Sequence, residues 1–320
     1  MPDLTERTAA LVETAGYGPQ DPLVVGVQQD GAAPVVVARG RTSDGDPLTA
    51  GSVLYTASLA KQVTAACAAL LVRGGRLDLE STLGLWMPEL PPWADTIRVR
   101  HLLSHTSGLP EPQEFEEIER AGLDRTTDGV LEGLVRADHL RSAPGSEHRY
   151  SNAGYVCLGV VVGRAAGRPL ADVAREQVLA PLGMASSGYW SGPAPHPPGA
   201  APLDPPHPAA LSVGDGGLWS TAGDLLRWNL ALDRDELGVS ALMQTPGRLD
   251  DGTPLDYAWD LGVREHAGRP VYRHGGRWAG LTAQLVRVAG DGTGVVVLAL
   301  DDDDDRTSAL ADALLDELTA

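Results

Sequence analysis

Strand-like apolar runs occur at both ends of this 320-residue chain, and this distribution constrains the fold most strongly. Residues 23–27 and 34–38, separated by Asp30-Gly31, are typical of an antiparallel hairpin. The C-terminal third has four further predicted strands, at 260–263, 270–273, 281–288 and 294–300, and then a helix from Thr307 to Leu318. The intervening residues favour helices and loops. We predict an α+β fold: one antiparallel sheet made from both chain ends and flanked by helices, with an inserted, mostly helical domain.

A chain of this length can bury a sizeable core as one large or two intertwined domains. We expect a single unit over 1–320, with an α/β part at about 1–60 and 210–320 and the helical part at about 61–209. Residues 1–16 have the pattern of an amphipathic helix, without the basic region and continuous apolar core of a signal peptide. No run of about twenty apolar residues appears. The sequence therefore predicts a cytoplasmic protein.

The formal net charge of −18 argues against nonspecific binding to nucleic acid or to an anionic membrane, because like charges repel. The acidic run 301–305 lacks the spaced ligands and the glycine of a calcium loop and is predicted to be a solvated loop. Small molecules or peptides are therefore the expected partners. The oligomeric state is left open.

Cysteine and histidine spacing gives no metal signature. Cys67 and Cys157 lie in apolar runs and are expected to fill the core as free thiols. His101 and His105 are four residues apart but lack the adjacent glutamate of an HExxH motif. We expect no metal ion and no other cofactor, and we expect His105 to shape a loop beneath the site.

The segment Ser58-Leu59-Ala60-Lys61 opens an apolar run of good helix formers, 61–72, that is ended by Gly74-Gly75. Three positions along a helix correspond to about one turn, so Lys61 can reach the Ser58 hydroxyl. A lysine accepts a serine proton only if burial or a nearby cation lowers its pKa. Taken alone, the same pair also fits an N-cap serine beside a solvated lysine.

Two more segments extend this pair. Tyr150-Ser151-Asn152 supplies a phenol that could carry the proton onward and an amide that could fix a substrate carbonyl. The backbone N–H of Ser58, at a helix start, could stabilise an oxyanion. His274-Gly275-Gly276 is the third segment, and its glycines let a strand approach a ligand closely. Together the three segments predict a serine acyl-enzyme site.

In their order and spacing, these motifs resemble the serine β-lactamase and penicillin-binding-protein superfamily, in the branch of class C β-lactamases, DD-peptidases, D-aminopeptidases and esterases. The resemblance covers most of the chain. Four flanking stretches carry it further: 97–110, which is similar to the family's RHLLTHTSGLP, and Pro144-Gly145, 181–184 and 216–225. It implies a β-lactamase/transpeptidase-like fold with the site between the sheet and the helical part.

The third motif departs from the Lys-Thr-Gly of many β-lactamases, which lowers the expectation of β-lactamase activity. Resemblance to the HxG subgroup implies that His274 donates a hydrogen bond or titrates beside Tyr150. It also implies that the backbone N–H of Arg277 is the second oxyanion donor, with Gly275 and Gly276 lining the substrate site. Trp278 follows closely enough to contact substrate.

We therefore hypothesise a serine hydrolase of esterase, amidase or carboxypeptidase type, which acylates Ser58 with an ester or amide substrate, possibly a D-amino-acid peptide. Catalysis would use Ser58, Lys61, Tyr150 and His274. Two alternatives stay open: an acyltransferase that uses the same acyl-enzyme, and a slowly deacylating penicillin-binding or sensor protein.

Overall fold

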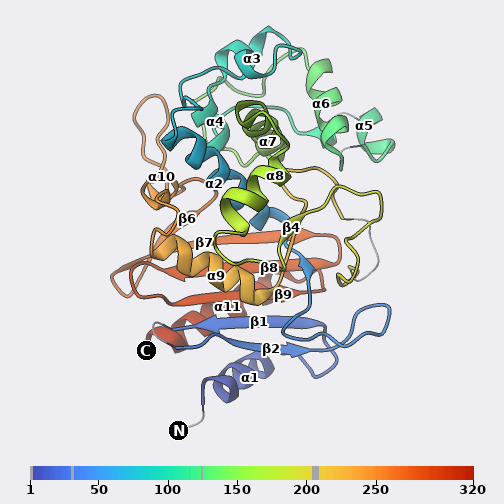
Figure 1. Ribbon diagram of the computed structural model, residues 1–320, viewed down its shortest axis with the longest axis vertical. Helices are drawn as coiled ribbons and strands as arrows, with labels where there is room; N and C mark the ends of the chain where they lie inside the picture. Colours follow the sequence, from blue (N-terminus) through green and yellow to red (C-terminus); the bar gives the residue numbers. More distant parts are fainter. Residues whose placement is uncertain (1–2, 30–31, 115, 124, 204–208) are drawn as a thin grey trace.

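The computed structural model describes residues 3–29, 32–114, 116–123, 125–203 and 209–320. Its main sheet is six-stranded and antiparallel, in the order β2-β1-β9-β8-β7-β6 (Figure 1). The strands are β1 (Leu23–Gln28), β2 (Val35–Arg39), β6 (Gly262–His266), β7 (Arg269–Trp278), β8 (Leu281–Val288) and β9 (Gly294–Ala299). Because β1 pairs with β2 on one edge and β9 on the other, the predicted sheet from both chain ends is confirmed.

In the sequence, the remaining elements lie mostly between the strands from the two ends of the chain. A small sheet has the order β3-β5-β4, with β3 (Leu54–Tyr55), β4 (Gly188–Tyr189) and β5 (Leu218–Ser220). The α-helices are α1 (Leu4–Thr14), α2 (Ala60–Arg73), α3 (Leu83–Trp86), α4 (Val99–Leu103), α5 (Glu116–Arg120), α6 (Thr127–Arg136), α7 (Asn152–Ala166), α8 (Leu170–Ala174), α9 (Ala222–Asp233), α10 (Ser240–Gln244) and α11 (Asp304–Thr319). Short 3-10 turns are η1 (Ala57–Leu59), η2 (Pro92–Thr96) and η3 (Pro112–Glu114), and η4 (Arg175–Leu179) is a π turn. Figure 1 shows the inserted helices at one end of the molecule and both termini toward the other.

The main sheet is covered on both faces. Since successive residues of a strand point to opposite faces, Leu23, Val25 and Val27 of β1 join a cluster with α1 and α11. Val24 instead joins the larger cluster that contains α9, α2 and α7. Burying each of these side chains stabilises the fold by about 1.5–3 kcal/mol. The sheet is thus a rigid support between two apolar layers.

Helices α2 and α7 form the centre of the helical part. All but three residues of α2 are buried, and α7 is buried over most of its length. Cys67 of α2 and Cys157 of α7 are both fully buried and free, which confirms their predicted role as core residues. Among the residues that the structure describes, no helix has the length and apolar character needed to cross a membrane.

Several predicted boundaries differ from the observed ones. The strand expected at 270–273 runs on through the His274-Gly275-Gly276 motif to the end of β7, while β6 begins at Gly262 rather than at residue 260. The hairpin turn Asp30-Gly31 lies outside the described residues.

The prediction of a solvated loop over residues 301–305 is wrong for its second half. Asp303 caps α11 by accepting a hydrogen bond from Arg306 N at 3.0 Å, and the helix begins at Asp304. Acidic side chains in a first helical turn are stabilised by the helix dipole, which explains why the run starts a helix.

Candidate active site

Ser58 lies in the 3-10 turn η1, immediately before α2. Lys61 follows in the first turn of α2, and its Nζ is 3.0 Å from Ser58 Oγ and 2.7 Å from the backbone oxygen of Asp215. The preceding Ala57 has a φ of +46°, a left-handed conformation that is disfavoured for residues other than glycine. The surrounding structure therefore holds a strained turn at the serine, as active sites often do.

Lys61 is the single lysine of the chain, and it is fully buried. Desolvation lowers its pKa, although the carboxylates of Asp215, Asp260 and Glu111 act in the opposite direction. A lowered pKa increases the neutral fraction of the amine near neutral pH. A neutral Lys61 can accept a proton from Ser58 across the contact that the two side chains already make.

Tyr150 lies at the rim of the site. The residue is 38% exposed, but its hydroxyl end is buried and is hydrogen-bonded to the Ser58 side chain. Desolvation, and then the negative charge of Asp260, raises the pKa of Tyr150 well above its ordinary value, against the effect of that hydrogen bond. Tyr150 is therefore a neutral phenol. Such a group can pass on one proton as it receives another, but it is not a standing base.

His105 lies beneath Tyr150, as expected from the sequence. The two rings stack with their centroids 4.4 Å apart, and His105 Nδ1 accepts a hydrogen bond from Ser151 N at 3.1 Å. Burial lowers the pKa of His105 to about 4, so the imidazole is neutral at physiological pH. His105 thereby supports the backbone of the second motif without adding charge to the site.

His274 is buried near Tyr150 and contacts two residues that the sequence motifs did not indicate. Its Nε2 lies 2.8 Å from Tyr257 Oη and 3.1 Å from Asp260 Oδ1, and Tyr257 donates to the same carboxylate oxygen at 3.1 Å. His105 Nε2 is 3.6 Å from that oxygen, beyond an ordinary hydrogen bond. We call Tyr257, Asp260 and His274 the β7 cluster.

Asp260 is fully buried and has a φ of +55°, which costs a non-glycine residue on the order of 1 kcal/mol. Burial acts to raise the pKa of Asp260, but the charge of His274 and the contacts with His105 and His274 outweigh it and hold the pKa below its usual value. Asp260 is therefore an ionised carboxylate. This role could not be predicted from the sequence, because Asp260 belongs to none of the motifs and lies at the start of a predicted strand.

A small pocket of about 100 Å³ opens beside Ser58. Asn152, Arg277 and Trp278 line it, so the structure brings these predicted substrate-binding residues to the serine. His274 and Gly275 line a different hollow of about 500 Å³. The predicted set is thus divided between two adjoining surfaces of β7.

Gly276 brings β7 close to the serine turn. A Cβ at this position would lie 2.7 Å from Thr56 O and 3.3 Å from Ala57 Cβ. Strand β6 pairs with β7 only as far as Arg273, so beyond that point the second edge of β7 runs along η1. This arrangement places the backbone of Arg277 near Ser58, where an oxyanion donor is expected.

Two further carboxyl groups near Lys61 were not predicted as site residues. Glu111 accepts hydrogen bonds from Asn152 N at 3.2 Å and Ala153 N at 3.3 Å and so caps α7. Asp215 lines the pocket beside Ser58. Burial raises the pKa of both groups, and the charge of Lys61 only partly opposes the shift.

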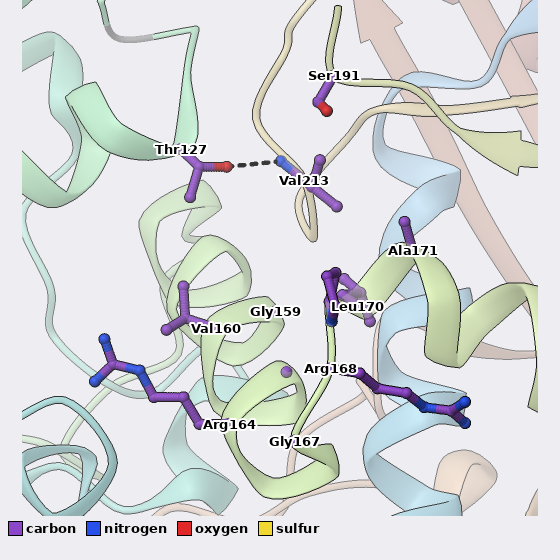
Figure 2. A pocket seen from close by; sticks show the side chains of 12 residues that line it. Thr127, Gly159, Val160, Arg164, Gly167, Arg168, Leu170, Ala171, Ser191 and Val213 are labelled. Atoms are coloured by element: carbon purple, nitrogen blue, oxygen red, sulfur yellow. Dashed lines mark hydrogen bonds between the residues drawn. The ribbon is translucent and has the colours of Figure 1, made fainter.

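A hollow of about 450 Å³ lies elsewhere, between α7 and α8 (Figure 2). Its lining is mostly apolar, with Val160, Leu170 and Val213, and none of the three motifs contributes to it. The three motifs therefore place the proposed chemistry outside this hollow. Over the described ranges, no three His, Cys, Asp or Glu side chains are arranged to hold a metal ion.

Comparisons with known proteins show the family and the fold of this chain. The family model described as Beta-lactamase matches residues 21–319. The chain is similar to Penicillin-binding protein 4* of Bacillus subtilis, with 29% identity over 280 residues, 75% of this chain and 59% of that protein. It is also similar to Esterase EstB of Burkholderia gladioli, with 30% identity over 265 residues, 63% of this chain and 66% of the esterase. The chain thus spans roughly three-fifths of the length of these relatives.

Among solved structures, D-amino acid amidase from Ochrobactrum anthropi SV3, complexed with L-phenylalanine, matches with a TM-score of 0.83 over 99% of both chains. The penicillin binding protein from Bacillus halodurans matches with a TM-score of 0.80 over 98% of this chain and 100% of that chain. Their sequence identities of 18% and 22% limit the likeness to the fold. The predicted β-lactamase/transpeptidase-like fold is confirmed.

Proposed function

Because this chain belongs to the Beta-lactamase family, we propose that it hydrolyses an ester or amide through a covalent acyl-enzyme on Ser58. The observation that carries this proposal is the 3.0 Å contact between Ser58 Oγ and the buried amine of Lys61. A serine hydroxyl becomes a good nucleophile only when a positioned base takes its proton. Lys61, with a pKa lowered by desolvation, supplies that base.

The proposed reaction has two halves. Ser58 Oγ attacks the carbonyl carbon while its proton passes to Lys61, and backbone N–H groups of Ser58 and Arg277 stabilise the oxyanion. The leaving amine or alcohol takes a proton through Tyr150 as its bond to the carbonyl carbon breaks. Water then attacks the acyl-enzyme, loses a proton through the same groups, and releases the acid and free Ser58.

The charges around the pocket support a substrate with an ammonium group near the scissile carbonyl, such as an amino-acid amide or peptide. Glu111, Asp215 and Asp260 all act on Lys61, and burial raises the pKa of Glu111 and Asp215. Burial disfavours the ionised form of these two carboxyl groups, so a cation bound beside them would favour ionisation and would itself be stabilised. Two of the matched proteins are named as a D-amino acid amidase and an esterase, which fits the proposed range.

His274 stands where many β-lactamases have a lysine, so we expect weak hydrolysis of β-lactams at most. The imidazole occupies this position within a buried cluster instead of presenting a flexible ammonium to a substrate carboxylate. Comparing nitrocefin with a p-nitrophenyl ester at equal enzyme concentration tests this point, and faster turnover of nitrocefin would contradict it.

The first test is intact-protein mass after exposure to a fluorophosphonate, with release of p-nitrophenol from short acyl esters measured in parallel. We expect one adduct on the wild type, none on Ser58→Ala, and ester turnover by the wild type only. D- and L-alanine p-nitroanilides, each with a free or acetylated amine, then test the substrate class. The free D-amine should react fastest.

Other outcomes separate the alternatives. Turnover that requires an added amine or alcohol would indicate an acyltransferase, and a long-lived acyl adduct would indicate a slowly deacylating penicillin-binding or sensor protein. Labelling of Ser58→Ala as strongly as the wild type would overturn the assignment of Ser58.

A further inference from the structure

Asp260 combines three features that are costly to maintain. Its carboxylate is fully buried, its backbone is left-handed, and its Oδ2 has no hydrogen-bond partner among the described residues. Glycine would satisfy the backbone at this position, and an apolar residue would avoid the buried charge. Strained backbone and incompletely satisfied polar groups concentrate where a side chain serves function. The contacts of Asp260 indicate that this function concerns the protonation of His274.

The hydrogen bonds of the β7 cluster determine which nitrogen of His274 carries a proton. Tyr257 has one hydroxyl proton, and it donates that proton to Asp260 Oδ1 at 3.1 Å. His274 Nε2 faces Tyr257 Oη at 2.8 Å and Asp260 Oδ1 at 3.1 Å, and both oxygens act as acceptors toward it. Nε2 must therefore bear the hydrogen. Nδ1, which has no partner among the described residues, is left as the free nitrogen.

We propose that Asp260 is a positioning residue, which with Tyr257 holds His274 in the Nε2–H form and leaves Nδ1 free to take up a proton beside Tyr150 during the reaction at Ser58. The last part rests on the proposed function. The tautomer and the charge pairing do not, because they follow from the contacts within the β7 cluster.

The location of His274 explains what this positioning achieves. The rings of His274 and Tyr150 are nearly parallel, with centroids 5.9 Å apart. When Tyr150 passes a proton toward Ser58 or the leaving group, negative charge develops on its hydroxyl, and a cationic imidazole beside it stabilises that charge. By its own negative charge, Asp260 disfavours the negative charge on the Tyr150 hydroxyl, since it raises the pKa of Tyr150. Asp260 therefore assists only through His274.

Other groups near His274 also titrate and must be separated from Asp260 by experiment. His105 is held neutral by burial, Lys61 stands on α2, and Tyr257 keeps its proton because burial and Asp260 raise its pKa. His148 lies beyond Tyr257, with the ring centroids 5.0 Å apart. None of these four groups is a carboxylate. Among the described residues, Asp260 carries the only carboxylate in direct contact with His274.

The test compares Asp260→Asn with Asp260→Gly. Asparagine retains the shape but removes the charge, whereas glycine suits the φ of +55° and removes the side chain. We expect both to fold and both to lower kcat by about tenfold or more with a smaller change in KM, the scale of a positioned proton-transfer group. A loss of melting temperature that accounts for the loss of activity in both variants would assign Asp260 a merely structural role.

Asp235 offers a matched control. It has a φ of +51° but is exposed, at the turn after α9, far along the chain from the three motifs. Asp235→Asn and Asp235→Gly change the same residue type in the same backbone conformation. Both should retain wild-type kcat.

The direct readout is the pair of ¹⁵N chemical shifts of the His274 ring, identified by their absence in His274→Gln. The wild type should show the Nε2–H tautomer, and Asp260→Asn should show a mixture of the two tautomers, because the carboxylate that accepts from Nε2 is gone. An unchanged tautomer in Asp260→Asn would overturn the proposal. This measurement needs no substrate, so it is distinct from a failure of Ser58 to be labelled, which would instead refute the proposed function.

Discussion

Ser58 and Lys61 come from a single short segment, whereas Tyr257, Asp260 and His274 come from a loop and from β7. The first pair is held by helix geometry, which fixes residues three apart at about one turn. The β7 cluster exists only when the loop that carries Tyr257 and Asp260 is packed against His274 of β7. Local geometry thus supplies the nucleophile, and tertiary assembly supplies the charges that tune it.

The largest effect is expected from Lys61, which tests the local pair. Lys61→Ala should lower kcat/KM by roughly a hundredfold or more, the scale of a positioned general base. Lys61→Arg retains a positive charge but cannot lose its proton, so it should be as inactive as the alanine variant. Steady-state hydrolysis of a p-nitrophenyl ester measures both. An active arginine variant would show that charge, not proton transfer, is what the site needs.

The single lysine also makes its protonation directly measurable. Protein labelled with ¹⁵N at lysine Nζ should give one side-chain signal, which belongs to Lys61. Because desolvation lowers the pKa of Lys61, the signal should titrate below the usual lysine range, and kcat/KM should rise with pH as Lys61 loses its proton. A signal that titrates in the ordinary range would contradict this assignment.

Gly276→Ala tests the junction between the serine turn and β7 and should have the next largest effect. The added methyl group would lie 2.7 Å from Thr56 O, so β7 must move away from the serine turn. We expect a loss of about tenfold or more in kcat/KM, since small displacements of reacting groups are costly. Gly275→Ala is the paired comparison, because its methyl would meet the flexible side chain of Gln284 at 3.2 Å. Equal losses in the two variants would show that the close approach is unimportant.

The smallest effect is expected from Tyr257→Phe. This change removes one donor to Asp260 but leaves the direct contact between His274 and Asp260 at 3.1 Å. Activity should fall only a few-fold, and the free energy of unfolding by about 1 kcal/mol, the usual net value of one hydrogen bond. Urea unfolding and steady-state kinetics measure the two quantities. A loss larger than that of Asp260→Asn would transfer the main positioning role to Tyr257.

The sequence predicted what depends on local periodicity and spacing. The alternating and apolar runs identified the sheet from both ends, and the three-residue spacing of Ser58 and Lys61 anticipated their contact. The roles of these residues remain predictions.

Asp215, Asp260 and Glu111 could not be found in this way. Asp260 lies in a loop and has a left-handed backbone conformation. Glu111 begins a charged segment that has the composition of a solvated surface. What makes them part of the site is burial against distant segments, which leaves no local pattern in the residues themselves.

The pairing of β1 with β9 joins strands at opposite ends of the chain, with Val25 opposite Val297. During synthesis, the segments of Ser58 and Tyr150 therefore emerge well before β7 to β9 complete the sheet. Pairings between such distant residues form slowly and leave strand edges unpaired in the meantime. A growing chain would carry the serine and its lysine without the strand that bears His274. Covalent labelling of Ser58 would thus report that the last strands have been made and have closed the sheet.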